Sequence, residues 1–224
     1  MPTYFENRRD AGRQLAAMLG DSLTAEDKSP LVLALPRGGV PVAYEIACAL
    51  DAPLDVMVVR KLGVPQYPEL AMGAIASGGV RTMNEAVVQD LGIDPQAVET
   101  VDRHARQALE ARERLYRGTR GAMPLRDRTI IVVDDGLATG ASLRAALQAV
   151  RAGRPARVVV ALPVAPAGAR ADFATLADRF VCLHEPEDFL SVGEYYVDFA
   201  QTDDHTVRTL LSRRTARASE PPAH

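Results

Sequence analysis

The sequence predicts an α/β fold: a mainly parallel sheet flanked by helices. Short runs rich in Val, Leu and Ile alternate along the chain with longer segments whose apolar residues recur at helical spacing. Three of these runs lead directly into loops rich in charged, glycine or other small residues, as expected where parallel strands present a binding edge. With 224 residues, 47% of them hydrophobic, the chain can form one sizeable core. We expect a single domain over residues 1–214 with a small additional lobe.

Four elements are predicted before Lys61. The first has apolar residues at helical spacing, and the second and fourth are apolar runs short enough to be buried strands. Pro41 opens the third element, because proline is favoured in the first turn of a helix. In chain order these elements are a helix, a strand, a helix and a strand, over residues 6–19, 31–36, 41–50 and 54–60.

The next segment, residues 60–83, is predicted to be irregular. Gly63, Pro65 and Pro68 exclude a helix there. We expect a long loop that leads into a small hairpin, with its turn at residues 77–79.

Two helices should follow. Asn84 can cap a short helix, and Asp94 followed by Pro95 combines an N-cap with proline at the first helical position. The second helix should extend to about Arg117, with a charged, solvated face to which we assign no function. Beyond it the alternation resumes, with strands over residues 129–134, 157–164 and 179–183 and helices over residues 142–153 and 168–177.

Composition narrows the functional classes. The formal net charge of −3 gives no reason to expect a nucleic-acid partner, and no apolar run is long enough to cross a membrane. The N-terminal residues are charged where a signal peptide would be apolar. Cys48 and Cys182 lie far apart in apolar segments, which favours buried thiols in a cytoplasmic protein.

The most informative stretch is IIVVDDGLATGAS, residues 130–142. An apolar strand ends in Asp134 and Asp135, and a loop of small residues then opens a helix. The amides of such a loop point outward together at the positive end of the helix dipole, which suits a phosphate. The hydroxyls of Thr139 and Ser142 can donate to the same anion.

Two carboxylates beside a phosphate site must bind something other than phosphate. The hydroxyls of a ribose fit, because carboxylates accept strong hydrogen bonds from them. The chain has no GxxxxGK[ST] motif, and no GxGxxG follows the first strand. The alternative for the aspartates alone is a strand-to-helix turn with an aspartate cap.

This stretch resembles the phosphoribosyl pyrophosphate (PRPP) motif of the type I phosphoribosyltransferases. The resemblance implies that Asp134 and Asp135 hold the ribose hydroxyls. It further implies that the 5-phosphate binds to the five loop residues Ala138, Thr139, Gly140, Ala141 and Ser142.

Two further loops match the family. LPRGGVP resembles its pyrophosphate loop, which often contains a non-proline cis peptide, so Arg37, Gly38 and Gly39 would face the diphosphate. Arg60 and Lys61 resemble an Arg-Lys pair that faces pyrophosphate in orotate and adenine members. Taken singly, the first loop could be a plain helix entry and the second a pair of solvated charges.

The resemblance also implies an activity. Such enzymes are Mg²⁺-dependent, use PRPP and a nitrogenous base in nucleotide salvage, and commonly form homodimers. Arg37, Lys61 and the two aspartates would be the catalytic residues, and residues 62–72 a mobile cover. No general base can be assigned, and Glu69 is only a loop candidate. The alternative is a PRPP-binding regulatory protein without transferase activity.

The family's hood lobe would comprise residues 62–83 and 184–205 with the N-terminal segment. Phe189, Tyr195 and Tyr196 are candidates for stacking on the base, although packing in the core explains them equally well. His205 should lie on the surface, in the first turn of a last helix. The tail over residues 215–224 has the composition of a disordered segment.

Overall fold

The centre of the protein is a five-stranded parallel sheet. A computed structural model describes residues 5–22, 27 and 29–218. The strand order is β2-β1-β6-β7-β8, and every neighbouring pair is parallel. The strands are β1 (Leu31–Ala34), β2 (Leu54–Val56), β6 (Thr129–Val133), β7 (Arg157–Val164) and β8 (Arg179–His184). The predicted fold class is confirmed.

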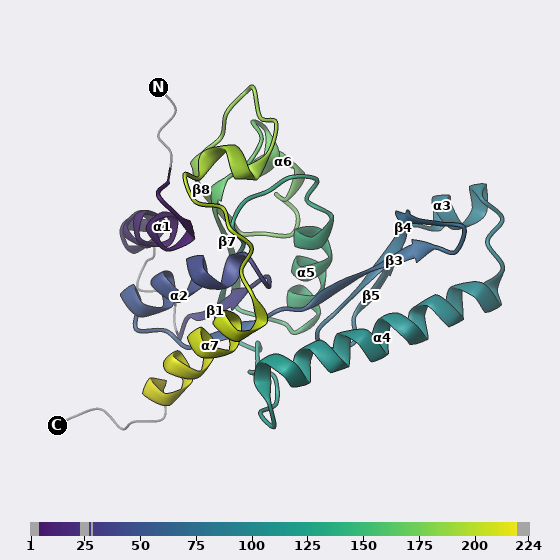
Figure 1. Cartoon of the computed structure of the whole chain (residues 1–224), viewed down its shortest axis with the longest axis horizontal. Coiled ribbons are helices and arrows are strands. Elements are labelled where there is room, and N and C mark those ends of the chain that lie inside the picture. Colours follow the sequence, from purple (N-terminus) through teal and green to yellow (C-terminus); the bar gives the residue numbers. More distant parts are fainter. Residues whose placement is uncertain (1–4, 23–26, 28, 219–224) are drawn as a thin grey trace.

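Helices cover both faces of this sheet (Figure 1). Side chains alternate between the faces, so Val32 packs with one set of helices and Leu33 with the other. A sheet covered in this way is apolar on both faces, which explains the unbroken apolar runs. One core contains α1 (Arg8–Ser22), α2 (Gly39–Ala49) and α7 (Asp204–Ala218), and the other contains α5 (Ala141–Ala152) and α6 (Ala169–Asp172).

The chain direction across the sheet reverses between β1 and β6. From β1 the chain moves outward to β2 on one side, and from β6 it moves outward to β7 and β8 on the other. The loops after β1 and β6 therefore leave their strands side by side, and the crevice between such loops is where open α/β sheets bind ligands.

A second, antiparallel sheet forms an arm beside the core (Figure 1). Its strands are β3 (Val59–Val64), β4 (Tyr67–Ala76) and β5 (Arg81–Met83).

This part of the structure differs from the sequence-based prediction in two respects. The predicted strand over residues 54–60 is two strands in two different sheets, and the predicted loop over residues 62–72 is a β-hairpin. Leu62, Val64 and Met72 are buried, so tertiary packing stabilises a pairing that the local glycine and prolines did not indicate. The predicted turn at residues 77–79 is confirmed.

Two helices complete the arm, α3 (Glu85–Asp90) and α4 (Pro95–Arg117). Both predicted caps are confirmed, because Asn84 accepts from the Val87 amide at 3.4 Å and Asp94 accepts from the Gln96 amide at 2.9 Å.

Arg117 joins the end of α4 to the central sheet. Its guanidinium donates from Nε to Asp55 at 2.9 Å and from Nη2 to the Val56 carbonyl, and both paired side chains are 7% exposed. We expect Arg117→Leu to lower the free energy of unfolding by about 3 kcal/mol, because Asp55 would remain buried without its counter-charge. Urea denaturation would measure this. Arg114→Leu, on the exposed side of the same helix, should change stability by no more than about 0.5 kcal/mol.

The C-terminal part returns across the core after β8. A short 3₁₀ helix, η1 (Val192–Tyr195), precedes a bridge between Tyr196 and Phe5. His205 is exposed in the first turn of α7, as predicted. The predicted disordered tail is wrong for residues 215–218, which continue α7, and its remainder, 219–224, lies outside the described residues.

Candidate ribose phosphate site

Gly38 and Gly39, which follow β1, lie directly against the residues that follow β6. A side chain at Gly38 would overlap the Asp135 carboxylate. A Cβ at Gly39 would lie 2.7 Å from the Val133 carbonyl oxygen and 2.8 Å from the Asp134 Cα. Glycine at both positions therefore allows the first loop to lie directly against the acidic pair. The loop also contains the non-proline cis peptide that the resemblance implied, between Pro36 and Arg37.

The loop after the aspartates forms an open set of donors. Gly140 has φ +74° and precedes the first turn of α5. Thr139 and Ser142 are exposed beside it. Within the described part of the chain, no group accepts a hydrogen bond from the amides of residues 138–143. These amides lie at the positive end of a 12-residue helix, so this loop has the donors that a phosphate requires.

The acidic pair has unequal environments. Burial raises the pKa of Asp134 well above its usual value, and the charge of Asp135 raises it further. The Asp135 amide donates to Asp134 Oδ1 at 2.9 Å, which fixes the two side chains relative to each other. The pair therefore favours a single negative charge over two.

This asymmetry has a consequence for stability. Because the pKa of Asp134 is raised in the folded state, ionising this side chain lowers the stability of the fold. The contribution of Asp134 to stability is therefore most favourable below its pKa in the unfolded chain, and it is lost as the pH rises through its pKa in the folded protein. Asp134→Asn should therefore stabilise the protein at pH 7, and this gain should disappear near pH 3. Thermal unfolding at both pH values would measure it, and equal gains at both would contradict the argument.

Arg8 covers the second carboxylate, and no sequence motif indicated this. The Nε of Arg8 lies 2.7 Å from Asp135 Oδ2, and its Nη1 donates to the Ala200 carbonyl at 2.7 Å. The guanidinium carbon lies 3.9 Å from the centre of the Phe199 ring. Helix α1 and the C-terminal segment therefore meet at the acidic pair, which only the tertiary structure could reveal.

The predicted aromatic residues are placed in different surroundings. Tyr196 is 6% exposed, and its hydroxyl donates to the Asp135 carbonyl at 2.6 Å, so this side chain supports the backbone of the acidic pair. Phe189 and Tyr195 stack on each other with their centroids 6.0 Å apart. Phe199, which the sequence reasoning missed, is 37% exposed beside Arg8.

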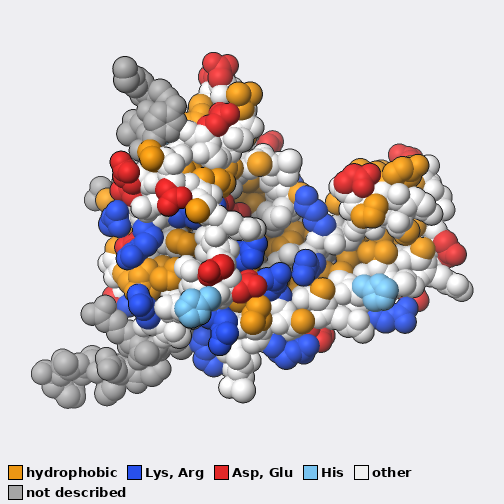
Figure 2. All heavy atoms as spheres, in the orientation of Figure 1, with side chains coloured by type: hydrophobic (Ala, Val, Ile, Leu, Met, Phe, Trp, Pro, Cys, Tyr) orange, Lys and Arg blue, Asp and Glu red, His pale blue; other side chains and the backbone are white. Residues whose placement is uncertain are grey.

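Arg60 and Lys61 point to opposite sides of β3, because consecutive strand residues alternate. Arg60 lines a cavity of about 170 Å³ together with Arg37. Lys61 instead lines a cavity of about 260 Å³ that it shares with Ala141 and Arg144 of α5. The structure therefore brings Arg37 and Arg60 together and separates Lys61 from them. Figure 2 shows the surface hollowed between core and arm, with Lys and Arg side chains gathered along the hollow.

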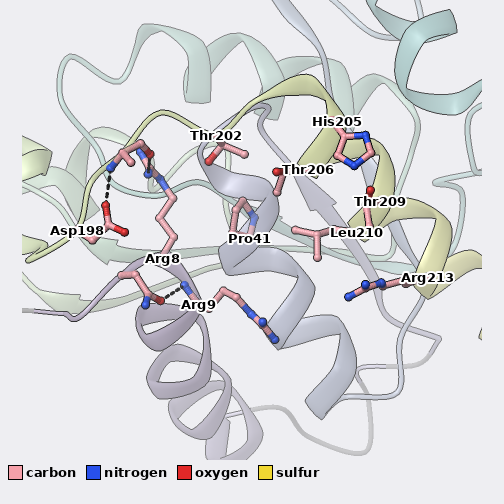
Figure 3. A pocket seen from close by; sticks show the side chains of 12 residues that line it. Arg8, Arg9, Pro41, Asp198, Thr202, His205, Thr206, Thr209, Leu210 and Arg213 are labelled. Atoms are coloured by element: carbon pink, nitrogen blue, oxygen red, sulfur yellow. Dashed lines mark hydrogen bonds between the residues drawn. The ribbon is translucent and has the colours of Figure 1, made fainter.

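A further cavity, of about 400 Å³, lies among α1, α2 and α7 (Figure 3). Arg8, Arg9 and Arg213 line it together with Pro41 and hydroxyls from α7. Asp134 and Asp135 are not among its lining residues, so Arg8 lies between this cavity and the acidic pair.

None of the helices within residues 5–22, 27 and 29–218 has both the length and the apolar character that a membrane span needs. Within the same residues, no group of three or more His, Cys, Asp or Glu side chains is arranged to hold a metal ion.

The family model and the similar sequences that match this chain indicate the same family. Residues 4–200 match the model of the phosphoribosyl transferase domain. Two Mycobacterium tuberculosis proteins are each 48% identical over 209 residues: "Putative phosphoribosyl transferase MT0597" (strain CDC 1551 / Oshkosh) and "Putative phosphoribosyl transferase Rv0571c" (strain ATCC 25618 / H37Rv). The matches cover 93% of this chain but 46% of each relative, so the chain spans about half their length. The crystal structure of TT1426 from Thermus thermophilus is 40% identical with a TM-score of 0.80, covering 94% of this chain and 98% of that one.

Proposed function

Because the chain belongs to the phosphoribosyl transferase domain family, we propose that it transfers ribose 5-phosphate from PRPP to a nitrogenous base and releases pyrophosphate. Family membership confirms the resemblance drawn from residues 130–142 and makes this the domain of a transferase enzyme. The observation that supports the proposal best is the contact between the Arg37–Gly39 loop and the acidic pair.

Each part of PRPP has a matching group in this arrangement. The free amides of residues 138–143 suit the 5-phosphate. The carboxylates of Asp134 and Asp135 suit the two ribose hydroxyls. Arg8 would then either move away from Asp135 or share the Asp135 carboxylate with a ribose hydroxyl. Arg37 and Arg60 line the adjoining cavity and suit the diphosphate. PRPP would therefore lie along the crevice from α5 toward the arm.

The charges fit the proposed displacement. The bond between C1 of the ribose and the diphosphate oxygen breaks with its electron pair on oxygen, and a nitrogen of the base forms the new bond to C1. Arginines beside the leaving oxygens stabilise the negative charge that develops there. The acidic pair lies on the ribose side, where positive charge develops.

The donor set also fits Mg²⁺. This ion takes oxygen ligands and keeps several waters, so it would be held mainly by diphosphate oxygens of PRPP, with the acidic pair nearby. When bound, it supplies positive charge to the departing pyrophosphate. Lys61, on the other side of β3, would act on the reaction only if the arm moved relative to α5.

The acceptor is proposed to be a planar base near Phe199, the partly exposed ring beside the acidic pair. The proposal extends to a cytoplasmic homodimer active in nucleotide salvage, with residues 62–83 and 184–205 and the N-terminal segment as the hood. Light scattering in solution would test the dimer.

Pyrophosphate release from PRPP and Mg²⁺ tests the proposed reaction, with a panel of purines, pyrimidines, orotate and nicotinate. Release that depends on one base would support the transferase and identify its acceptor. If PRPP binds and no base stimulates release, the proposal of transfer to these bases is wrong, and a PRPP-binding regulatory protein becomes the better assignment.

A further inference from the structure

Helix α4 brings an additional cation to the cavity that contains Arg37 and Arg60. The lining of this cavity of about 170 Å³ also includes Arg112 and Tyr116, one turn apart on α4. Arg112 adds a third positive charge to the lining, so the cavity suits a small anion. Its wall thus contains three guanidinium groups, from a core loop, from β3 and from α4.

A carboxylate from the C-terminal helix neutralises part of this charge. Asp204 Oδ1 accepts hydrogen bonds from Arg112 Nη1 at 2.8 Å and from the Tyr116 hydroxyl at 2.7 Å. Arg37 Nη1 approaches the same oxygen at 3.9 Å. One carboxylate oxygen therefore lies within reach of two guanidinium groups, in the manner of an oxygen of a bound phosphate.

Arg112 is held firmly in this position. Its Nη1 donates to the Tyr116 hydroxyl at 3.1 Å, and Tyr116 is only 4% exposed. Arg112 itself is 32% exposed, so it is open to a ligand from the cavity side. A guanidinium fixed in this way loses little conformational entropy when an anion binds.

We propose that Arg112 binds the diphosphate of PRPP together with Arg37 and Arg60, and that Asp204 occupies this cation cluster until the diphosphate displaces it. This inference rests on the proposed function, since it assumes that PRPP is the ligand. Three arginines and one carboxylate leave two positive charges at the cavity when it is empty of ligand. Displacing Asp204 makes the third charge available to the diphosphate.

Calorimetric binding of pyrophosphate with Mg²⁺ tests this directly. We expect Arg112→Gln to weaken pyrophosphate binding by about tenfold or more, because a hydrogen bond between charged groups is lost. Arg112→Lys should restore part of the affinity, since it keeps the charge but loses the planar fork. Arg114→Gln is the matched control on the same helix, with a side chain 69% exposed, and should bind as the wild type does. Asp204→Asn should bind pyrophosphate more tightly than the wild type, because it removes a competing charge.

Ribose 5-phosphate separates this inference from the proposed function. Wild type and all variants should bind it with similar affinity, which also shows that they are folded, and PRPP should displace bound pyrophosphate. If the wild type bound neither ligand, the proposed function would fail and this inference with it. If the wild type bound both but Arg112→Gln bound pyrophosphate normally, or Asp204→Asn bound it more weakly, only this inference would be overturned.

Discussion

Replacing both aspartates of the motif, Asp134→Asn with Asp135→Asn, is expected to reduce PRPP affinity at least tenfold. A charged carboxylate that accepts a hydrogen bond from a ribose hydroxyl contributes about 1.5–3 kcal/mol. The pair favours one negative charge, and losing that charge alone already exceeds the ~1.4 kcal/mol that corresponds to a factor of ten. Titration calorimetry with PRPP and Mg²⁺ would measure the change.

Besides any contacts with the ribose, the double substitution changes two contacts within the protein. Asn keeps an oxygen where Asp134 accepts from the Asp135 amide, so the turn should persist. Arg8 loses its ion pair with Asp135, and Arg8→Gln in the wild-type background is the control for that loss. Unchanged PRPP affinity in the double variant would remove the ribose assignment, whatever the stability of the fold.

Gly39→Ala is expected to lower turnover by about 100-fold, the effect of displacing reacting groups by ~1 Å. The new Cβ would meet the Val133 carbonyl oxygen and the Asp134 Cα, both at less than 3.0 Å. These are backbone atoms, so no side chain can rotate away, and the loop that contains Arg37 must separate from the acidic pair. Forcing such a contact also costs about 1–3 kcal/mol of stability.

Pyrophosphate release at saturating PRPP, with thermal unfolding alongside, would measure both effects. Gly20→Ala is the matched control, because this residue is inside α1 and, its chain neighbours and its own helix backbone aside, no atom of the described residues lies within 4 Å of a Cβ there. That control should keep full turnover and gain about 0.5–1 kcal/mol of stability. Full turnover in Gly39→Ala would show that the loop contact is not needed for catalysis.

The same two loops show how far the sequence could lead. An apolar strand, two aspartates and a small-residue helix entry are adjacent in the chain, so their joint geometry is decided locally. The sequence alone therefore predicted the turn from the aspartates into α5, the caps at Asn84 and Asp94, and the parallel sheet. The alternation of apolar runs required helices on both faces, because such strands are buried on both sides.

Other features depended on contacts between distant segments. The sequence of residues 54–60 indicates one strand, but these residues divide between the central sheet and the arm. The hairpin that follows is stabilised by the burial of its apolar side chains, which the local turn residues did not predict. Arg60 and Lys61 looked like one pair, yet the pleat of β3 sends them into different cavities. The sequence identified a pair, and only the fold decided which member meets Arg37.

The sequence by itself determined the fold class, the family and the motif that would hold ribose 5-phosphate, since each depends on residues close together in the chain. Only the tertiary structure placed Arg8 against Asp135 and Arg112 beside Arg37. Arg8 belongs to the first helix and Arg112 to a charged helix of the arm, and neither lies in a recognisable pattern. The positions of these two side chains depend on how their helices pack against segments that are distant in the sequence. A charge interacts most strongly with groups that lie within a few ångströms of it in the folded protein.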